Sequence, residues 1–400
     1  MIQLPIYMDN HATTRVDPRV MEAMSPYFSE DYGNAGSSHQ FGFTARDAVE
    51  SARKSIAAAV GARPKEIVFT SGATESNNLA IRGVAEKHAE RGKHLVSVCT
   101  EHPSVLDPLE KLRRRGYEVT LLPVVESPDD RAGRLLPELV EEAIRPDTVL
   151  VSVMLANNEI GTIQPLEEIG QICRSRGVLL HTDATQAVGR IAVDVEQLQV
   201  DLMSFTAHKI YGPKGVGALY VRRRNPQVRM SSLIDGGGQE RGLRSGTLNT
   251  PGIVGFARAL ELCLEEMPRE QQRIRGLRDR MFAELSAGLS GVALNGPALV
   301  PPELRIAGNL NLSFAQIDGE ALLMSMKDVA VSSGSACTSA DPEPSHVLRN
   351  LGLGHELIHG GIRLGLGRFN TVEEVDFVVR AVTETVTRLR NMAGPSIGAS

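Results

Sequence analysis

The sequence predicts an α/β fold in which a large doubly wound sheet domain is joined to a smaller α+β domain. Between about residues 45 and 260, helix-like and strand-like patterns alternate, which is typical of a parallel sheet with helices on both faces. After Gly255 the alternation stops and a long charged helical pattern begins. The length of 400 residues also exceeds what one hydrophobic core usually serves, so we expect two domains.

The first part of the chain contains short apolar runs of the kind that form buried parallel strands. Residues 149–155 and 178–181 are rich in β-branched and aliphatic side chains. Residues 164–176, between these two runs, have an amphipathic helical pattern. We expect further strands at 66–70 and 94–99, and further helices at 46–60 and 79–90.

The second part has a different texture. A long charged helix is predicted at about 256–289 and a final amphipathic helix at about 372–391. Shorter strands are predicted near 309–314 and 362–365. The Gly/Ser-containing tail, 393–400, is expected to be frayed.

Composition and charge argue against several classes of function. A formal net charge of -5, with 23% charged residues of mixed sign, gives no general attraction to nucleic acid or to an anionic membrane. No run approaches the roughly 18 apolar residues that span a bilayer. The first ten residues lack the basic start of a signal peptide. We expect a cytoplasmic protein without nucleic-acid or membrane partners.

The four cysteines differ in their surroundings. They lie far apart, without the spacing of a zinc site, so free thiols and no metal site are expected. Cys99, Cys173 and Cys263 stand among apolar residues and are predicted to be small core side chains. Cys337 lies in 332–340, a run without bulky side chains that packs poorly as core and leaves the thiol accessible.

Residues 69–75, Phe-Thr-Ser-Gly-Ala-Thr-Glu, follow a predicted short strand and open a helix. Backbone N–H groups and hydroxyls at such a place can hold a phosphate, aided by the helix dipole. The run is neither a Walker loop nor a GxGxxG, which argues against a nucleotide. An ordinary helix cap is the alternative.

Two further strand ends carry residues suited to chemistry. Asp183 ends a hydrophobic strand, where a carboxylate is costly unless it pairs with a cation. That cation could be a metal ion, with His181 as a second ligand, or a protonated ring nitrogen of a cofactor; a helix-capping carboxylate is the alternative. Thr206, His208 and Lys209 lie within four residues. A lysine whose pKa is lowered by nearby cations can act as an imine-forming nucleophile, although a surface Lys–His pair gives the same pattern.

Other polar positions are weaker signals when taken singly. The glycine-dense stretch 236–247 contains Arg241, Arg244 and Thr247, which suit an anion-facing or interface loop better than a flexible linker. His102 follows the strand predicted at 94–99, and Asn157 and Asn158 follow the strand predicted at 149–155. Each of these is more often a satisfied polar group than a catalyst.

Together these segments resemble the group I cysteine desulfurases of the NifS/IscS type, which are fold-type I pyridoxal-phosphate enzymes. Any one motif is weak, but their ordered conjunction is specific and covers the chain almost from end to end. The resemblance implies a large cofactor-binding domain at 15–260 and a small domain, formed by 1–14 and 261–400, that carries the Cys337 loop. The matching stretches are 9–14, 70–78, 100–102, 157–161, 181–186, 204–215, 241–247, 331–340 and 362–368.

The resemblance also implies residue roles. Lys209 would bind pyridoxal 5'-phosphate covalently, Asp183 would pair with its ring nitrogen, and His102 would stack on the ring. Gln186 and Asn158 would bond the ring oxygen and position the substrate, and Arg363 would clamp the substrate carboxylate. The phosphate would be held by Ala73, Thr74, Thr206 and His208, and by the partner subunit's Thr247 in a homodimer. Thr206 stands where many members have serine.

The implied activity converts L-cysteine to L-alanine. Lys209 would move the Cα proton, His102 would shuttle a proton, and Cys337 would carry the sulfur as a persulfide on a mobile loop. An acceptor protein, such as an iron–sulfur scaffold, would take the sulfur for cluster assembly or tRNA thiolation. A selenocysteine lyase, an aminotransferase of the same fold, and a non-catalytic sulfur-carrier module are the alternatives. Cys337 argues against the aminotransferase and Lys209 against the non-catalytic module.

Overall fold

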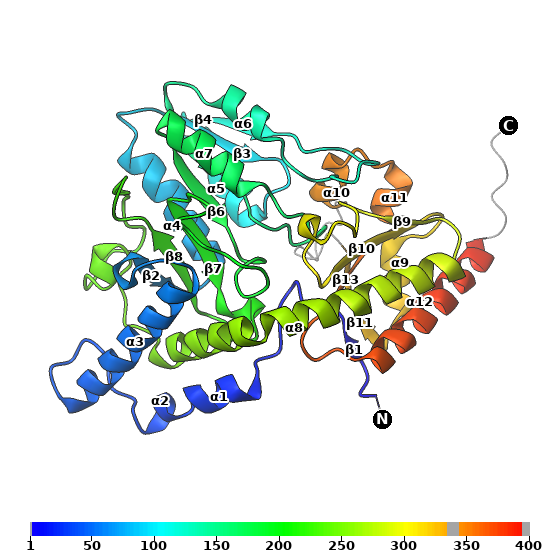
Figure 1. The fold of residues 1–400 in the computed structure, drawn as a ribbon, viewed down its shortest axis with the longest axis horizontal. Coiled ribbons are helices and arrows are strands. Elements are labelled where there is room, and N and C mark those ends of the chain that lie inside the picture. Colours follow the sequence, from blue (N-terminus) through cyan, green and yellow to red (C-terminus); the bar gives the residue numbers. More distant parts are fainter. Residues whose placement is uncertain (1, 334–343, 394–400) are drawn as a thin grey trace.

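A seven-stranded mixed sheet forms the centre of the larger part of the molecule (Figure 1). The computed structural model describes residues 2–333 and 344–393, so Cys337 with its expected loop, and the tail after residue 393, lie outside the described residues. Five neighbouring strands, from β7 to β4, are parallel, whereas β8 is antiparallel to both of its neighbours. In spatial order the strands are β2 (Ile67–Thr70), β8 (Gly217–Val221), β7 (Leu202–Thr206), β6 (Leu179–Asp183), β5 (Thr148–Ser152), β3 (His94–Val98) and β4 (Glu118–Leu122).

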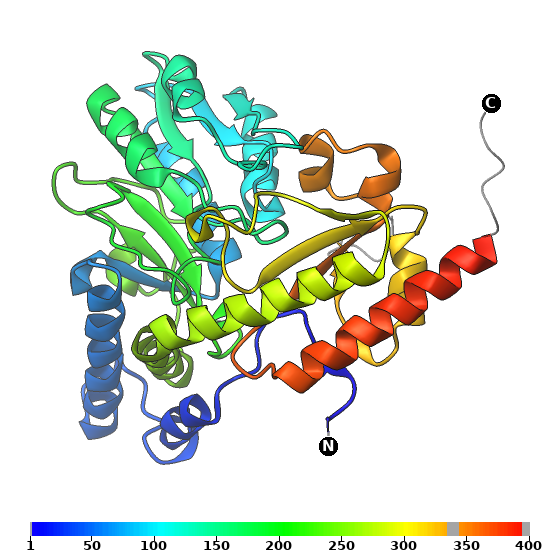
Figure 2. The ribbon, with the colours of Figure 1, turned by 45° about the vertical axis from the view of Figure 1, so that its right-hand side comes forward.

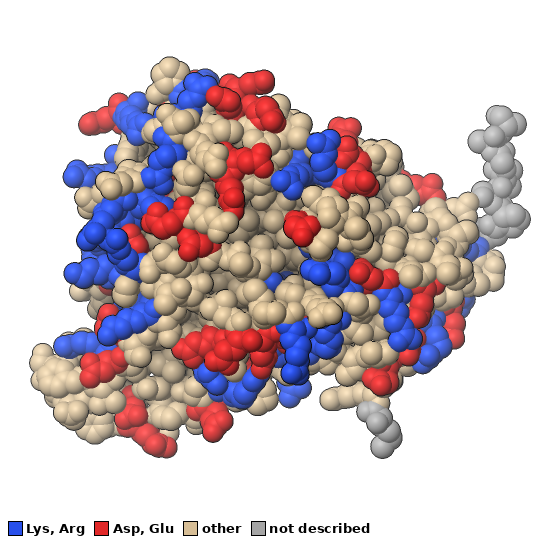
Figure 3. All heavy atoms as spheres, in the orientation of Figure 1, with Lys and Arg blue, Asp and Glu red and all other residues tan. Residues whose placement is uncertain are grey.

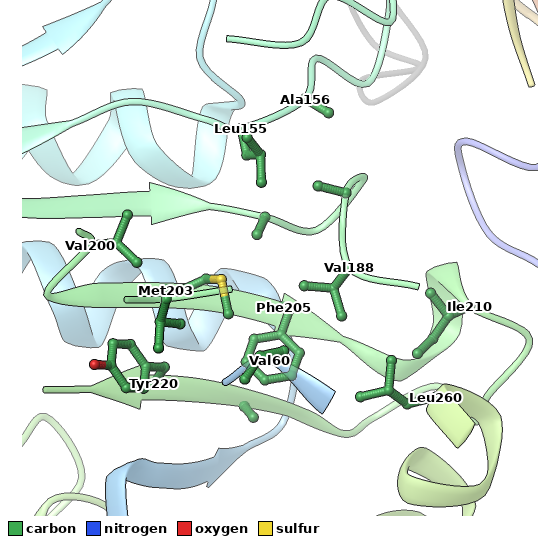
Figure 4. Close-up of a cluster of buried hydrophobic side chains, with 14 of the residues drawn as sticks. Val60, Leu155, Ala156, Val188, Val200, Met203, Phe205, Ile210, Tyr220 and Leu260 are labelled. Atoms are coloured by element: carbon green, nitrogen blue, oxygen red, sulfur yellow. The ribbon is translucent and has the colours of Figure 1, made fainter. Parts of the chain in front are cut away.

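Helices cover both faces of this sheet, which explains why its strands are almost continuously apolar. Successive side chains of a strand point to opposite faces, so Leu202 of β7 joins one hydrophobic core and Met203 and Phe205 join the other. Figure 4 shows Met203 and Phe205 beside Tyr220 and Leu260 in the second of these cores. The first core is covered by α4 (Ala73–Lys87) and α5 (Pro103–Arg113), and the second by α3 (Gln40–Ala59), α6 (Pro137–Ala143), α7 (Leu166–Arg176) and the first half of α8 (Thr250–Gly288).

A second, smaller assembly contains a four-stranded antiparallel sheet and a two-stranded parallel one. It has its own hydrophobic core, and Figure 2 shows α12 and the second half of α8 running beside it. The larger sheet has the order β12 (Ser332–Ser333), β13 (Gly361–Gly365), β10 (Asn309–Phe314) and β9 (Val292–Leu294), and the smaller pairs β1 (Ile6–Tyr7) with β11 (Val329–Ala330). Helices α9 (Gly319–Ser325) and α12 (Val372–Ala393) pack on this core, and α11 (His355–His359) lies beside β10. The helix α10 (His346–Asn350) instead packs through Val347 and Leu348 on the core of the large sheet.

The helix α8 and the N-terminal segment connect the two assemblies. Along α8, Cys263 belongs to the core of the large sheet and Ile274 to the core of the small one. Residues 9–14 cross between the two assemblies: the Asn10 amide donates to the Gly365 carbonyl (2.8 Å), and the Thr14 hydroxyl donates to the His208 carbonyl (2.9 Å). Two short helices, α1 (Pro18–Met24) and α2 (Pro26–Ser29), follow this segment.

Every helix and strand that the sequence predicts is present, with end points shifted by a few residues. The largest shifts are at the starts of α3, α4 and α8, which begin at Gln40, Ala73 and Thr250 rather than near 46, 79 and 256. In α4, polar Thr74, Glu75 and Asn77 obscure the apolar period of the first turns. Two central strands, β7 and β8, were not predicted individually. The doubly wound mixed sheet with a smaller α+β part is the architecture predicted from the sequence.

Acidic and basic side chains are interspersed over the face shown in Figure 3. This arrangement agrees with the mixed charge pattern of the sequence. Within the residues described, no helix is both long and apolar enough to cross a membrane.

Candidate active site

The polar residues that follow the parallel strands gather at one edge of the large sheet. The carboxyl ends of β3, β5, β6 and β7 meet there because these strands are parallel and adjacent. His102 follows β3, Asn158 follows β5, Asp183 ends β6, and Lys209 follows β7 in the short helix η2 (Ala207–Lys209). Since β2 is antiparallel to β8, and β8 to β7, the amino end of α4 lies at the same edge.

The Lys209 amine is held against the main chain of the N-terminal segment. Its Nζ donates to the carbonyls of His11 (2.6 Å) and Ala12 (2.7 Å). Burial, reinforced by the positive charges of Arg363 and Arg190, lowers the pKa of Lys209 to about 7. A substantial fraction of the amine is therefore uncharged and nucleophilic at neutral pH.

The Asp183 carboxylate is buried without a basic partner among the described residues. Its Oδ1 accepts the Thr185 N–H (2.9 Å) and its Oδ2 accepts the Asn77 amide (2.7 Å). A buried carboxylate with two neutral donors still has lone pairs for a cationic N–H, and it is costly without one. This environment suits a protonated ring nitrogen.

The metal interpretation of Asp183 has no support in the described part of the chain. The two ring nitrogens of His181 lie 2.8 Å from the Ser152 hydroxyl and 3.0 Å from the Ser204 hydroxyl. Burial lowers the pKa of His181 to about 4, so the ring is neutral and held by these serines. No group of three or more His, Cys, Asp or Glu side chains suited to a metal ion occurs in the described residues.

His102 caps the amino end of α5. Its Nδ1 accepts the Ser104 N–H (3.1 Å) and lies 2.8 Å from the Ser104 hydroxyl, which in turn lies 2.9 Å from the Asn77 amide nitrogen. Burial lowers the pKa of His102, so the imidazole is neutral at pH 7. His102 thus presents Nε2 as its remaining ring nitrogen.

The first turn of α4 is a ready anion site. The helix starts after Gly72 without a side-chain cap, which leaves its first N–H groups available. A Cβ on Gly217 of β8 would lie only 2.7 Å from the Gly72 Cα, so glycine is required for this close approach. Thr206 stands beside the same turn, where its hydroxyl donates to the Val216 carbonyl (2.9 Å). Ala73 and Thr74 are the first two residues of the helix.

His208 and Gln186 are both anchored to the N-terminal segment. The His208 Nδ1 lies 3.1 Å from the Thr13 hydroxyl, and burial, reinforced by neighbouring positive charges, lowers the pKa of His208 to about 4. The Gln186 amide donates to the His11 carbonyl (2.9 Å), and its oxygen accepts from Arg190 (2.9 Å). These contacts hold both side chains at the edge of the sheet where Lys209 lies.

Arg363, in β13, brings the small sheet to the site. One terminal nitrogen pairs with Asp9 (2.9 Å), and the other donates to the Asn158 carbonyl (3.0 Å). Its Nε is buried without a hydrogen-bond partner in the described structure. A guanidinium with an unused donor suits a bidentate ligand such as a carboxylate.

One expected site residue, Thr247, stands apart from this cluster. Thr247 is exposed, on a loop fixed to the domain by the ion pairs Arg53–Glu240 (2.7 Å) and Arg244–Glu75 (2.8 Å). The loop is therefore pinned rather than a free linker. Cys337 lies outside the described residues.

The other three cysteines are free, inert thiols. Cys173 and Cys263 are buried, and Cys99 is partly buried against the same core, as predicted. Burial raises the pKa of Cys99 to about 11 and those of Cys173 and Cys263 to about 12. None of the three is a ready thiolate.

Four residues of the site were not singled out from the sequence: Asn77, Ser104, Thr185 and Asp9. Asn77 lies in the second turn of α4 at a fully buried position, and only the fold shows that it faces Asp183. Asp9 belongs to a segment that matches the family, but the pattern does not reveal its pairing with Arg363. For Asn77, the only signal in the sequence was a polar residue within an otherwise helical pattern.

These features fit pyridoxal phosphate. The uncapped start of α4 suits its phosphate, the unpaired buried carboxylate of Asp183 suits its ring nitrogen, and the uncharged amine of Lys209 suits its carbonyl carbon. The three groups lie at one edge of the sheet. The fold and the site together define a fold-type I pyridoxal-phosphate enzyme.

Comparison with known proteins agrees. The family model described as aminotransferase class-V matches residues 6–378. A protein of Anaeromyxobacter sp. (strain Fw109-5), named cysteine desulfurase IscS, is 57% identical over 98% of this chain and 95% of its own length. A solved NifS-like protein has a TM-score of 0.87 with 40% identity over 96% of this chain and 100% of its own. A structure titled "SspA in complex with cysteine" has a TM-score of 0.79 with 36% identity over 92% of this chain and 100% of its own.

The chain therefore belongs to the aminotransferase class-V family, and within it to the group I cysteine desulfurases of the NifS/IscS type.

Proposed function

We propose that this protein is a pyridoxal-phosphate-dependent cysteine desulfurase that converts L-cysteine to L-alanine and passes the sulfur, as a persulfide on Cys337, to an acceptor protein. The observation that carries the proposal is the Lys209 amine, whose pKa of about 7 and position beside Asp183 and Arg363 suit amino-acid chemistry. The curated relatives with 50–57% identity bear the same activity in their names.

The residues that would hold the cofactor come from several elements that end at the same edge of the sheet. Lys209 would attach to it, Asp183 would pair with its ring nitrogen, His102 would stack on the ring, and Gln186 and Asn158 would contact the ring oxygen and the substrate. Its phosphate would bind Ala73, Thr74, Thr206 and His208. When bound, the cofactor supplies a ring that withdraws electrons from the substrate Cα.

The protein's own groups then bind the substrate and move its protons. Arg363 takes the substrate carboxylate, for which its free Nε and two terminal nitrogens provide donors. The Lys209 amine is uncharged above its pKa of about 7, so it can accept the Cα proton. Such positioned proton transfer contributes roughly 10²–10⁴-fold to a rate. His102 accepts the Ser104 N–H at Nδ1, so Nε2 is the ring nitrogen left to contact the substrate or cofactor.

Cys337 completes the sulfur transfer. Its thiolate attacks the sulfur of the substrate, an S–S bond forms, the Cβ–S bond of the substrate breaks, and the carbon takes a proton to give alanine. The balance is L-cysteine plus thiol to L-alanine plus persulfide, without an external oxidant. The thiols of Cys99, Cys173 and Cys263, whose pKa values are raised by burial, are poor alternatives.

Assays of alanine and sulfide from L-cysteine test the proposal. The wild type, loaded with cofactor, should show visible absorbance and release both products in the presence of a thiol reductant. Lys209→Ala should lose both the absorbance and the activity. Cys337→Ala should keep the absorbance and lose at least 10²-fold in alanine formation, whereas Cys99→Ala serves as the matched control and should stay active.

Each alternative function gives a different result. An aminotransferase would retain its turnover in Cys337→Ala and form a keto acid rather than alanine. A selenocysteine lyase would turn over selenocysteine but not cysteine. A non-catalytic module would show no absorbance even with added cofactor. Any of these three outcomes would overturn the assignment.

The assembly and cellular setting are part of the proposal. We place the large domain at 15–260 and the small one at 1–14 and 261–400. The two separate cores support a division into two parts, although Ile306, Val347 and Leu348 of the second range pack in the core of the large sheet. In a homodimer, the exposed Thr247 would reach the partner's phosphate site.

The free thiols of Cys99, Cys173 and Cys263 support a reducing compartment such as the cytoplasm. Iron–sulfur assembly or tRNA thiolation would use the sulfur.

A further inference from the structure

Asp183 and His102, which approach the proposed cofactor from different strands, are joined by a continuous chain of hydrogen bonds. The chain runs from Asp183 Oδ2 to the Asn77 amide nitrogen (2.7 Å), then to the Ser104 hydroxyl (2.9 Å) and on to His102 Nδ1 (2.8 Å). Asn77 is fully buried in α4, and Ser104 is 7% exposed in the first turn of α5. Neither intermediate residue has a role in the function proposed above.

The direction of every bond in this chain is fixed by Asp183. An ionised carboxylate only accepts hydrogen bonds, so the group of Asn77 that faces it must be the NH₂ group. That group also faces the Ser104 hydroxyl, and its two hydrogens satisfy both neighbours. The Asn77 oxygen, turned away from them, has no partner in the described structure. The reversed amide would set its oxygen against the carboxylate, which is repulsive.

The hydrogen bond that Ser104 accepts from Asn77 also sets the direction of its bond to His102. Because the Ser104 oxygen accepts from Asn77, its single hydrogen is free to point at His102 Nδ1. The main-chain N–H of Ser104 donates to the same nitrogen (3.1 Å). A nitrogen that accepts two hydrogen bonds carries no proton, so the proton of the neutral ring lies on Nε2.

We propose that Asn77 and Ser104 are positioning residues that link Asp183 to His102 and hold His102 as its Nε2–H tautomer. The proposal deepens the function above, because it assumes that His102 and Asp183 serve the same cofactor. It makes Nε2–H of His102 the one ring group that can donate a hydrogen bond. It also ties the orientation of the ring to the carboxylate that faces the ring nitrogen of the cofactor.

The surroundings of His102 leave this chain as the main control of its tautomer. The charged or titratable groups that act on the ring are Asp183 on β6, Lys209 on η2, His346 on α10 and Asp107 on α5. Those groups act through space on the total charge of the imidazole. Only the Ser104 hydroxyl and N–H contact Nδ1 directly within the described residues.

The first test is ¹⁵N NMR of histidine-labelled full-length protein, with and without cofactor, where His102→Gln identifies the signals. The wild type should show His102 with a bare Nδ1 and a protonated Nε2 between pH 6 and 8. In Ser104→Ala, one donor to Nδ1 is gone, so the Nδ1–H tautomer should increase roughly fivefold or more. Asn77→Ala should shift the tautomer in the same direction, because it frees the Ser104 hydroxyl to accept from Nδ1–H.

The double variant separates a chain from two independent effects. If Asn77 acts on His102 through Ser104, the tautomer ratio in Asn77→Ala/Ser104→Ala should equal that in Ser104→Ala alone. Ser104→Thr retains the hydroxyl and should restore the wild-type ratio. Asn78→Ala is the matched control, since this neighbouring amide donates to Thr74 in the same helix.

These results can fail without affecting the proposed function. A wild type with Nδ1–H, a ratio unchanged in Ser104→Ala, or additive effects in the double variant would each overturn the relay, even if alanine and sulfide still form. Conversely, the tautomer measurement in cofactor-free protein stays valid if the desulfurase assay fails. In active protein, Ser104→Ala should move the midpoint of the pH profile of kcat, while Asn78→Ala should not.

Discussion

At the scale of single residues, the pKa of Lys209 depends on Arg363, the neighbour that we propose also binds the substrate. Arg363 is the first charged group after burial that lowers the pKa of Lys209, while Asp9, the ion-pair partner of Arg363, raises it. Removing the guanidinium therefore deletes a repulsive charge and leaves the Asp9 carboxylate unpaired. Both changes favour the protonated amine.

We therefore predict that Arg363→Gln raises the pKa of Lys209 above the value of about 7 in the wild type. In cofactor-free wild-type protein, the rate of pyridoxal-phosphate uptake, followed by visible absorbance, should rise as pH increases through about 7, because the amine loses its proton. In the variant this rise should occur at higher pH. An unchanged midpoint would show that Arg363 does not control the amine. Arg273→Gln, in α8, where the guanidinium donates to the Asn370 carbonyl (2.7 Å), provides a control for loss of one positive charge.

The residues that act on the proposed cofactor could be predicted from the sequence, while those that hold them could not. Lys209, Asp183 and His102 lie at strand ends, where a doubly wound sheet places its ligands, so their pattern alone is informative. Asn77 lies inside a helix, and Asp9 is 354 positions from its partner Arg363. Contacts of this kind depend on how the elements pack, and a local pattern does not specify them.

At the scale of elements, the close approach of β8 to the turn before α4 shapes the phosphate site. A Cβ on Gly217 would lie 2.7 Å from the Gly72 Cα and 2.8 Å from the Phe205 carbonyl oxygen. Both are main-chain atoms, which cannot move aside as a flexible side chain can. The turn must therefore shift if Gly217 is replaced.

Gly217→Ala is expected to weaken pyridoxal-phosphate affinity at least tenfold and to destabilise the fold by about 1–3 kcal/mol, since it overpacks a tight contact. Equilibrium dialysis and thermal unfolding would measure the two effects. Gly276→Ala is the matched control, because its added Cβ meets no atom within 4 Å and its backbone is helical. Wild-type affinity in Gly217→Ala would show that the turn is not set by this contact.

A hydrogen bond joins Glu159, in the loop after β5, to Ser345 at the start of α10, and its contribution to stability should depend on pH. The Ser345 hydroxyl, which caps α10, donates to the Glu159 carboxylate, and burial raises the pKa of Glu159 to about 7. Between its ordinary pKa and about 7 the folded state holds a proton that the unfolded state has lost. This contribution to stability is present below the ordinary pKa and is lost as pH rises through about 7.

The Glu159→Gln side chain stays neutral at every pH, so this variant should not lose that stability as pH rises through about 7. Its unfolding free energy relative to the wild type should therefore increase from pH 5 to pH 8, by at most about 3 kcal/mol. Urea unfolding at the two pH values measures the difference, and Glu168→Gln on the exposed side of α7 controls for the change in net charge. A difference that is the same at pH 5 and 8 would contradict the buried, protonated carboxyl.

The elements that could be predicted are those whose apolar runs have the right length and period. Residues 309–314 and 372–391 match β10 and α12 closely, since each is bounded by polar or glycine residues. β7 and β8 were missed as separate strands: Ser204 interrupts the apolar pattern of β7, and β8 is only five residues long and begins with Gly217. The serine is tolerated inside the sheet because it bonds His181, a contact that appears only when the strands are adjacent.

At the scale of the whole molecule, the site is built from two assemblies that must keep a fixed relation. Lys209 and Asp183 belong to the large sheet, whereas Arg363 belongs to the small one and reaches Asn158 across the boundary.

Arg368 stabilises the junction between the two assemblies: its side chain is 6% exposed and pairs with Asp17 (2.9 Å) and Glu270 (2.8 Å). Breaking a buried pair from one side typically costs about 3–5 kcal/mol, so Arg368→Ala should lower stability by that order in thermal unfolding.

The proposed homodimer adds a final test, because each cofactor site would take Thr247 from the other chain. If so, a Thr247→Tyr chain, whose bulky side chain should block the partner's site, and a Lys209→Ala chain should each be inactive alone. A mixed dimer contains one site with Lys209 from the first chain and Thr247 from the second, and this site is wild type. Random re-pairing makes about half of the dimers mixed, so mixing should restore about a quarter of the wild-type activity. If Thr247 instead served its own chain, neither site of the mixed dimer would be complete and no activity would return.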